Sequence, residues 1–392
     1  MSRILYLIII VALTQCSHKN RANDKEIFFE NFKIKKISVL EHEDFVGVLL
    51  DGIYLFGETD SIVSLYNYEQ KKIRILGIGK SSINDTLCLQ NLFDKYHIEN
   101  YLGHCFVNTD SIFILTNIMN NDSSRLNYFV FLLNMKGEIK NKWDISALTG
   151  IDNTYFCVKS LFQNRMSIKN DNIICMTDIH LRKSAKADVA EIPTELVLNI
   201  KTDLAYFIYA KPDLYGEGKY YGNHAKNHSK AFLNDTVFVL SFPVDHTIYK
   251  YNINGNLIDK KMCKSVYIDD FKDFEWSATM TINKIIEIQV TSPYYYQIQF
   301  DKENRLLYRI VLHEQDALND AGDKNTVFDK SFSIIVMDEQ LNIIGEYFVP
   351  PYHLCPYLLN TNLPGSPFMI MYQSESSKFI YVKYEYIDKR KK

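Results

Sequence analysis

Short runs of apolar residues, either alternating with polar ones or wholly apolar, recur along the chain from residue 27 onward. They are rich in Ile, Val, Phe and Tyr, and Asn, Asp, Lys or Gly interrupts them at short intervals. Because alternation with a period of two places every second side chain on one face of a strand, the pattern predicts short β-strands joined by hairpins. Residues 84–101 are the best candidate for a short helix. Examples of predicted strands are residues 110–116, 127–134, 235–242, 332–337 and 379–387.

A repeated unit joins many of these predicted strands. A strand ends in Asn or Asp, a polar turn follows, and an Ile or Leu begins the next strand. Asn, Asp and Gly tolerate the positive φ angles that tight hairpins need, so each unit predicts a hairpin. A further hairpin is expected around residues 374–377. The units start at Asn67, Asn134, Asn199, Asn252, Asp301 and Asp338.

The spacing of these hairpins indicates the fold class. A four-stranded blade of a β-propeller needs about 40 to 50 residues, and about seven such units fit the length of the chain. The sequence therefore predicts an all-β fold, a β-propeller with seven blades or with six, in which residues 34–40 pair with the C-terminal sheet and close the ring. A pair of β-sandwiches is the alternative. No linker or shift in composition divides the chain, which favours a single domain over residues 27–392.

The first residues predict export rather than a membrane span. Arg3 precedes an apolar run over residues 4–13, and Cys16 follows. About ten residues rise only about 15 Å as a helix, half the hydrocarbon thickness of a bilayer. Residues 1–15 are therefore expected to be a signal peptide. The hydrophilic residues 16–26 suit a flexible tether between a membrane anchor and the domain.

The end of this segment, Leu13-Thr14-Gln15-Cys16, resembles the lipobox of bacterial lipoproteins. In such proteins the signal peptide is cleaved before the cysteine, and that cysteine carries the lipid. The resemblance implies lipidation of Cys16. No later segment approaches the run of about 18 apolar residues that a transmembrane helix needs, so lipid would be the only anchor.

Charge and composition narrow the classes of function. The chain has 44 Lys and Arg against 47 Asp and Glu, a net charge of -3, which leaves no cationic surplus for nucleic-acid binding. With 15 Gly and 9 Pro in 392 residues, collagen-like and low-complexity chains are excluded. Besides Cys16, the cysteines are scattered without CxxC spacing, which indicates buried free thiols rather than metal ligands.

Residues 77–81, Gly-Ile-Gly-Lys-Ser, contain part of a phosphate-binding loop. Such a loop requires another glycine five positions earlier than the second one, and Arg74 stands there. A turn between sheets is the better interpretation. No nucleotide or other cofactor is expected.

Residues 211–230 form a polar and aromatic insertion with candidate binding chemistry. His224 and His228 are four positions apart and would share one face of a helix, where they could bind a metal ion. The glycine and asparagine directly before His224 argue against a preformed helix, and no acidic residue accompanies the pair, so no metal site is expected. The candidate ligand-binding residues are Tyr215, Tyr220, Tyr221, His224 and His228, because tyrosine offers a flat ring and a hydroxyl to a carbohydrate or peptide.

With these features, the chain resembles the β-propeller lipoproteins of unknown function in Bacteroides. The segments that carry the resemblance are residues 249–258, 307–311 and 332–346, together with the lipobox-like start. The resemblance implies a six- or seven-bladed fold and a place in the cell envelope as an outer-membrane lipoprotein. It carries over no catalytic residue.

The function expected from the sequence is that of a lipid-anchored binding or scaffolding module. Its partners would be the membrane, through the lipid, and a glycan, a peptide or another envelope protein. The alternative is an envelope hydrolase or lyase that acts on glycans with a site at the mouth of the propeller channel. Fold alone does not decide between the two, and the sequence assigns no catalytic residue.

Overall fold

The structure of the protein is a computed structural model. The expected signal peptide and tether, with Cys16, lie outside the residues that it describes. It describes residues 32–41, 48–56, 60–67, 69–78, 84–119, 126–149, 156–159, 166–179, 193–210, 212, 220–275, 280–349, 359–360, 368–373 and 378–387.

The described residues form six antiparallel sheets. The first contains β2 (Val48–Phe56), β3 (Asp60–Asn67), β4 (Lys72–Ile78) and β5 (Asn84–Cys88). The second contains β6 (Ile98–Asn108), β7 (Ser111–Met119), β8 (Leu126–Leu133) and β9 (Ile139–Asp144). The third contains β10 (Phe156–Lys159), β12 (Asn172–Ile179), β13 (Pro193–Asn199) and β14 (Leu204–Tyr209), with β11 (Ser167–Lys169) also paired to β12.

The remaining sheets come from the second half of the chain and its two ends. The fourth contains β15 (Ser229–Phe232), β16 (Val237–Ser241), β17 (Thr247–Asn252) and β18 (Leu257–Met262). The fifth contains β19 (Tyr294–Asp301), β20 (Leu306–Leu312), β21 (Phe332–Asp338) and β22 (Ile343–Val349). The sixth contains β1 (Phe32–Glu41), β25 (Lys378–Tyr386), β24 (Phe368–Gln373) and β23 (Leu359–Asn360). The helices are α3 (Gln90–Tyr96), α4 (Ile145–Thr149) and α5 (Ile282–Thr291), with 3-10 turns η2 (Asn223–Lys226) and η3 (Val327–Asp329).

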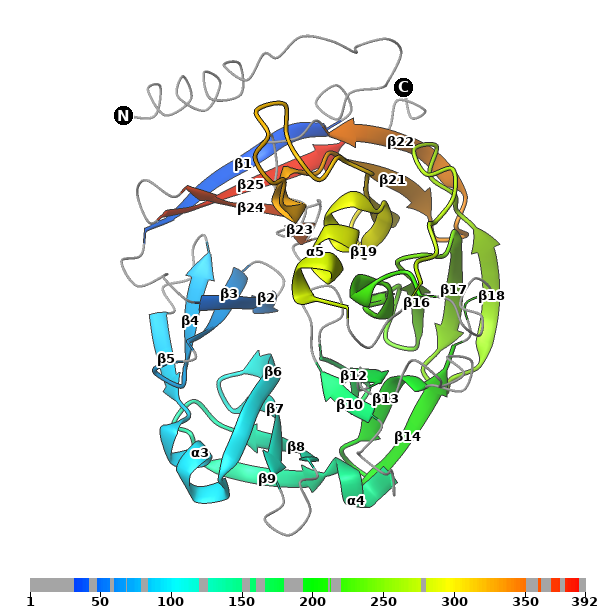
Figure 1. Ribbon diagram of the computed structural model, residues 1–392. Helices are drawn as coiled ribbons and strands as arrows, with labels where there is room; N and C mark the ends of the chain where they lie inside the picture. The colour runs from blue at the N-terminus through cyan, green and yellow to red at the C-terminus, as the bar shows by residue number, and fades with distance from the viewer. Residues whose placement is uncertain are drawn as a thin grey trace.

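The six sheets are arranged around a common centre, with β5, β9, β14 and β18 on the outside (Figure 1). The expected all-β class is therefore confirmed. The pairing expected for residues 34–40 is also confirmed, because β1 pairs with β25 from Ile34 opposite Tyr384 to Leu40 opposite Phe379. The first and last described strands thus share one sheet.

The repeated Asn and Asp units are hairpin turns, but they do not each mark a separate sheet. The units at Asp301 and Asp338 both belong to the fifth sheet, where they close β19–β20 and β21–β22. This double use explains why the hairpin spacing favoured seven sheets although the described residues form six. The side chain of Asp338 shows why these residue types recur, since its Oδ1 accepts the N–H groups of Gln340 and Asn342 inside the turn.

The short helix expected within residues 84–101 is α3, which covers Gln90–Tyr96 between β5 and β6. Its apolar residues Leu92 and Phe93 are buried in the cluster between the first and second sheets. The helix is shorter than the expected range, because β5 occupies its first residues and β6 its last. Apolar residues in these two strands happen to continue the spacing that is typical of a helix.

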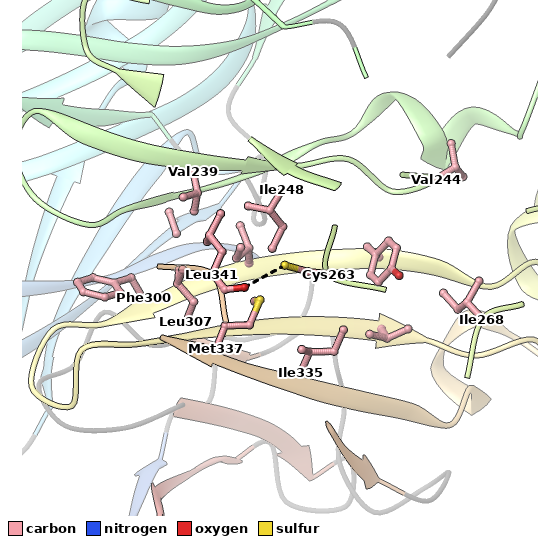
Figure 2. Packing of buried hydrophobic residues seen from close by; sticks show 14 of the residues in the cluster. Val239, Val244, Ile248, Cys263, Ile268, Phe300, Leu307, Ile335, Met337 and Leu341 are labelled. Carbon is pink, nitrogen blue, oxygen red and sulfur yellow. Dashed lines mark hydrogen bonds between the residues drawn. The ribbon is translucent and has the colours of Figure 1, made fainter. Parts of the chain in front are cut away.

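Apolar clusters fill the spaces between neighbouring sheets. Figure 2 shows one of them, in which Val239 and Ile248 of the fourth sheet pack with Leu307 and Ile335 of the fifth. Further clusters join the first sheet to the second, the second to the third and the third to the fourth. Because both faces of a sheet are covered in this way, β20 is buried along its whole length, and all of its residues except Arg309 are apolar or aromatic.

One buried guanidinium ties the fifth sheet to the loops of the fourth. Arg309 on β20 has no exposed surface, and its Cζ lies 3.3 Å from the centroid of the Tyr295 ring. All five of its N–H groups have acceptors, so the desolvated charge is fully hydrogen-bonded. The acceptors, at 2.5 to 3.4 Å, are Ser241 Oγ and the carbonyl oxygens of Phe242, Asp245, His246 and Cys263.

Arg309→Lys is expected to lower the free energy of unfolding by about 3–5 kcal/mol, because an ammonium cannot reach all of these acceptors and leaves several buried carbonyls without a donor. Urea unfolding measures the effect. Arg305→Lys is the matched control, since Arg305 is 73% exposed and pairs with Glu339 at the surface; a change below about 1 kcal/mol is expected there. Equal losses in the two variants would contradict a structural role for the buried guanidinium.

Candidate functional site

The two ends of the sheets differ in their connections. Successive antiparallel strands run in opposite directions, so connections within a sheet alternate between its two ends. In the fourth and fifth sheets one end has only short turns, residues 233–236, 253–256, 302–305 and 339–342. The opposite end, called here the long-loop rim, has residues 210–228, 242–246, 263–293 and 313–331.

The long loops contact one another at this rim. Phe274 N–H donates to Tyr220 O at 2.8 Å, which joins the loop that contains η2 to the loop that contains α5. Lys330 Nζ donates to Ser292 O at 2.8 Å, which joins the loop between β20 and β21 to the same segment. Figure 1 shows α5 close to the common centre of the sheets, beside β19. The rim over the fourth and fifth sheets is therefore a continuous structure of several loops.

The tyrosines proposed from the sequence have different environments. Tyr215 lies outside the described residues, as does Cys16. Tyr220 is half-buried, and its backbone N–H donates to Asp273 Oδ1 at 2.9 Å. Tyr221 is 7% exposed and belongs to the apolar cluster between the fourth and fifth sheets. Of these residues, Tyr220 is the one whose side chain the structure places partly at the surface.

His224 and His228 do not share a site. His228 is buried and its Nε2 lies 2.8 Å from Glu195 Oε1, while Lys230 Nζ donates to Glu195 Oε2 at 2.7 Å. Glu195 belongs to β13 and Lys230 to β15, so this group joins the third sheet to the fourth. We call His228, Lys230 and Glu195 the Glu195 cluster. Its carboxylate compensates the buried ammonium, as a desolvated charge requires.

His224 lies in η2 and packs against the fifth sheet. Its ring is 6% exposed, with its centroid 4.4 Å from that of Tyr294. Burial, and then the charge of Lys330, lower the pKa of His224 to about 3. The imidazole is therefore neutral near pH 7, with one N–H donor and one acceptor nitrogen. Neither nitrogen has a hydrogen-bond partner in the described structure.

Lys330 lies beside His224 in the loop before β21. It is 1% exposed, and its Nζ donates to Ser292 O and His313 O, each at 2.8 Å. Burial lowers the pKa of Lys330 to about 7. Among the described residues this ammonium has no acidic partner, and Ser292 Oγ, also buried, has no hydrogen-bond partner. We call His224, Ser292 and Lys330, around the Tyr294 ring, the His224 group.

A second polar network lies next to this group. His313 Nε2 is 3.0 Å from Ser333 Oγ, and Ser333 Oγ donates to Glu346 Oε1, which also accepts Ser265 Oγ at 2.6 Å. The carboxylate thus binds the serine and not the histidine. A serine nucleophile needs the carboxylate on the far nitrogen of the histidine, so this order does not make a catalytic triad. Ser333 has no exposed surface, and the network serves to join β21, β22 and the loop after β18.

No group of three or more His, Cys, Asp or Glu side chains in the described ranges could hold a metal ion. Cys88, Cys105, Cys175 and Cys263 are free, the last three are buried, and burial raises the pKa of Cys105 to about 12, so its thiol stays protonated. Within the part of the chain that the structure describes, no helix has the length and apolar character of a membrane span.

Sequence reasoning found His224 through its spacing from His228, but it missed Ser292 and Lys330. Both lie in loops without a local motif, 68 and 106 positions after His224 by their numbers. Tertiary packing brings them together, and no pattern in the surrounding residues marks either of them.

The arrangement defines a class of protein: an all-β protein built from consecutive four- or five-stranded antiparallel sheets, with one elaborated rim. The family model described as "Domain of unknown function (DUF4221)" matches residues 105–347. The chain belongs to this family, which confirms the expected likeness to a Bacteroides family of unknown function.

Solved structures give the same picture. The chain is similar to the crystal structure of a member of the DUF4221 family from Bacteroides vulgatus, with 16% identity, a TM-score of 0.69 and coverage of 91% of this chain and 99% of that chain. It is more distantly similar to a luciferin-regenerating enzyme, with 10% identity, a TM-score of 0.38 and coverage of 89% and 95%. A streptogramin B lyase follows with 9% identity, a TM-score of 0.38 and coverage of 91% and 99%. Likeness at the level of the last two supports no statement about this chain. No curated protein matches it.

The packing around His224 can be tested at Gly222, which has a φ of +97°. A Cβ there would lie 2.8 Å from His224 Cε1 and 2.9 Å from Ile288 Cγ2. Gly222→Ala is expected to lower the free energy of unfolding by about 2 kcal/mol more than Gly322→Ala, because overpacking adds to backbone strain. Gly322 is the matched control, with a φ of +85° and nothing within 4 Å of a Cβ. Thermal and urea unfolding measure both; equal losses would show that His224 and Ile288 move away at no cost.

Proposed function

We propose that the protein is a lipid-anchored, six-bladed β-propeller of the bacterial cell envelope that binds a ligand at its long-loop rim. Six sheets around a common centre, with the first and last described strands paired, support the propeller. The observation that carries the binding role is the difference between the two ends of the fourth and fifth sheets. Binding residues are often found on loops that a rigid scaffold holds in place. In the fourth and fifth sheets the long loops all lie at one rim.

The polar groups of the two ends support the same proposal. At the short-turn end, side chains such as Asn252 and Asp301 accept the N–H groups of their own turns. At the long-loop rim, both ring nitrogens of His224 and the Oγ of Ser292 are buried and have no partner in the described structure. Buried polar groups in folded proteins are nearly always hydrogen-bonded, so groups without a partner at a loop-rich rim point to a ligand.

Binding is preferred over the alternative of glycan hydrolysis or lysis because the buried carboxylates are already engaged. Glu195 binds His228 and Lys230, and Asp245 accepts the N–H of Thr247 and the hydroxyl of Tyr249. Most glycoside hydrolases need two carboxyl groups that flank the scissile bond and face the substrate. No specific feature of the described rim favours such a pair.

The ligand class that fits the rim is a glycan, a peptide or a segment of an envelope protein. Ile282 and Ile286 on α5 and Leu318 in the loop between β20 and β21 are exposed, and Tyr220 and Tyr267 are half-buried aromatic side chains. Aromatic rings with a hydroxyl offer an apolar face and a hydrogen bond to such ligands. The lipobox-like sequence before Cys16 supports attachment to a membrane through lipid.

The rim is tested by a thermal-shift screen of envelope glycans and short peptides, with each stabilising compound titrated against two variants. Tyr220→Ala at the long-loop rim is expected to weaken binding about tenfold, because it removes aromatic contact area. Glu303→Ala, at the exposed turn between β19 and β20, is the control and should leave the Kd unchanged. Compounds that bind both variants like the unmodified protein would place the site away from this rim.

The anchor is tested by expressing the full chain in a Gram-negative bacterium and separating membranes from soluble fractions. The protein is expected in the membrane fraction, and mass spectrometry should find acyl chains on Cys16 as the first residue. Cys16→Ser should release the protein to the soluble fraction. Cys88→Ser, which replaces an exposed cysteine elsewhere, should leave it in the membrane. A chain that starts upstream of Cys16, or lacks acyl groups, would rule the anchor out.

A further inference from the structure

Lys330 is a buried cation without a counter-ion in the described structure. Its side chain is 1% exposed, and its two acceptors are the backbone carbonyl oxygens of Ser292 and His313. The charge of Glu314 raises the pKa of Lys330 slightly against the effect of burial, but the Glu314 side chain is 54% exposed and pairs with Lys272. Carbonyl dipoles compensate a desolvated ammonium only in part, so the charged form of Lys330 is costly here, and burial lowers its pKa to about 7.

Two further polar groups close to Lys330 have no hydrogen-bond partner among the described residues. They are the His224 imidazole, 6% exposed, and the Ser292 hydroxyl, on a residue 5% exposed. The Tyr294 ring lies beside two of these residues, because its centroid is 4.4 Å from that of His224 and 5.7 Å from Lys330 Nζ. Ser292 is joined to Lys330, since its carbonyl oxygen accepts from Lys330 Nζ at 2.8 Å. Each group can donate a hydrogen bond: an ammonium N–H, an imidazole N–H and a hydroxyl.

In the Glu195 cluster of the same molecule, a carboxylate binds a buried histidine and a buried lysine together. There a buried histidine and a buried lysine, His228 and Lys230, bind the two oxygens of one carboxylate at 2.8 and 2.7 Å. The His224 group has the same pair of residue types, equally buried, with a hydroxyl in addition. None of the described residues supplies a carboxylate to it.

We propose that His224, Ser292 and Lys330 form a binding site for the carboxylate group of a small ligand. The site rests on the proposed function, since all three residues belong to the long-loop rim, and it defines the ligand as an acid. The carboxylate oxygens take the position that Glu195 takes in the other cluster and accept hydrogen bonds from Lys330 Nζ, the His224 ring and Ser292 Oγ. The Tyr294 ring packs against the group that carries the carboxylate.

The location of the site sets the route of entry. His224 lies in η2, and Ser292 directly follows α5, which contacts η2. The residues are nine-tenths or more buried, so the ligand enters while the two short elements separate and is enclosed when they close. A cation is excluded as the ligand, because the ammonium of Lys330 repels it.

The test is a titration of the full chain with sodium acetate, sodium succinate and sodium glucuronate, followed by thermal shift and calorimetry at constant ionic strength, with sodium chloride as the reference. At least one of these acids is expected to raise Tm in a saturable way. Lys330→Met and His224→Phe should each weaken the Kd about tenfold to hundredfold, as expected for loss of a hydrogen bond to a charged group. Lys284→Met on α5, where Lys284 is 52% exposed, is the matched control and should bind like the unmodified protein.

Folding of the variants does not limit the test. Lys330→Met removes a buried charge that has no acidic partner, so the unliganded variant is expected to melt at the same temperature as the unmodified protein or higher. His224→Phe keeps an aromatic ring against Tyr294. A loss of the ligand-induced shift in a variant that melts normally therefore reports on binding.

Proton uptake gives a second readout. The titratable groups around Lys330 are His224 from η2, Tyr294 from β19, and His313 and Glu314 after β20. Burial lowers the pKa of Lys330 to about 7, so at pH 8 most molecules hold a neutral amine. A bound carboxylate favours the ammonium, so binding at pH 8 should take up a proton, visible as a dependence of the binding heat on the buffer. The Lys330→Met variant should show no uptake.

Three results would overturn the carboxylate site: no stabilisation by any of the acids, stabilisation by inorganic phosphate alone, or an unchanged Kd in both Lys330→Met and His224→Phe. If neutral glycans or peptides still bind and Tyr220→Ala still weakens them, the rim keeps its binding role and only the carboxylate site is lost. If the acids bind in a Lys330-dependent way while Tyr220→Ala has no effect on any ligand, the carboxylate site is supported. The proposal that the rim surface around Tyr220 binds ligands is then contradicted.

Discussion

The structure depends on the burial of both faces of its sheets between neighbours. Strands such as β19 and β20 are mostly apolar or aromatic and are buried along their whole length. Their few polar residues are buried with them. A sheet of this kind is stable only when another sheet covers each side. Among the described residues, apolar clusters cover the fourth sheet on both sides, because they join it to the third and to the fifth. The pairing of β1 with β25 then joins the first and last described strands in one sheet, with β25 inside that sheet and β1 at its edge.

Polar side chains between the sheets fix how they fit together. Arg309 binds loops of the fourth sheet from within the fifth, and Glu195 binds His228 and Lys230 across the third and fourth. Near the N-terminus, His104 Nε2 lies 2.6 Å from Ser64 Oγ and joins the second sheet to the first. Two apolar surfaces can shift against each other with little loss of stability. A buried charge pair or hydrogen bond stabilises the protein only when its two groups are in the right relative position. These contacts therefore set the relative position of neighbouring sheets.

The same requirement that buried polar groups find partners separates scaffold from site. Arg309 and the Glu195 cluster are complete within the protein, and so are the turns that Asn and Asp side chains close. The His224 group is incomplete: it has the residue types of the Glu195 cluster but no acid among the described residues. We interpret completeness as a mark of structural role and the missing acid as a mark of ligand binding, which gives the long-loop rim a chemical preference as well as a location.

The sequence by itself determined the elements that local physics controls. Period-two apolar patterns identified the strands, and the Asn and Asp units identified the hairpins, because these side chains bind their own turns whatever the rest of the chain does. It also indicated the pairing of residues 34–40 with the C-terminal sheet. It did not determine the number of sheets, because the hairpins at Asp301 and Asp338 look alike and only their packing assigns them to one sheet. It suggested His224 and His228 as a pair. In the folded protein His224 lies beside Tyr294 and Lys330, whereas His228 binds Glu195. Contacts between residues so far apart in the chain depend on how the sheets pack, and only the tertiary structure decided them.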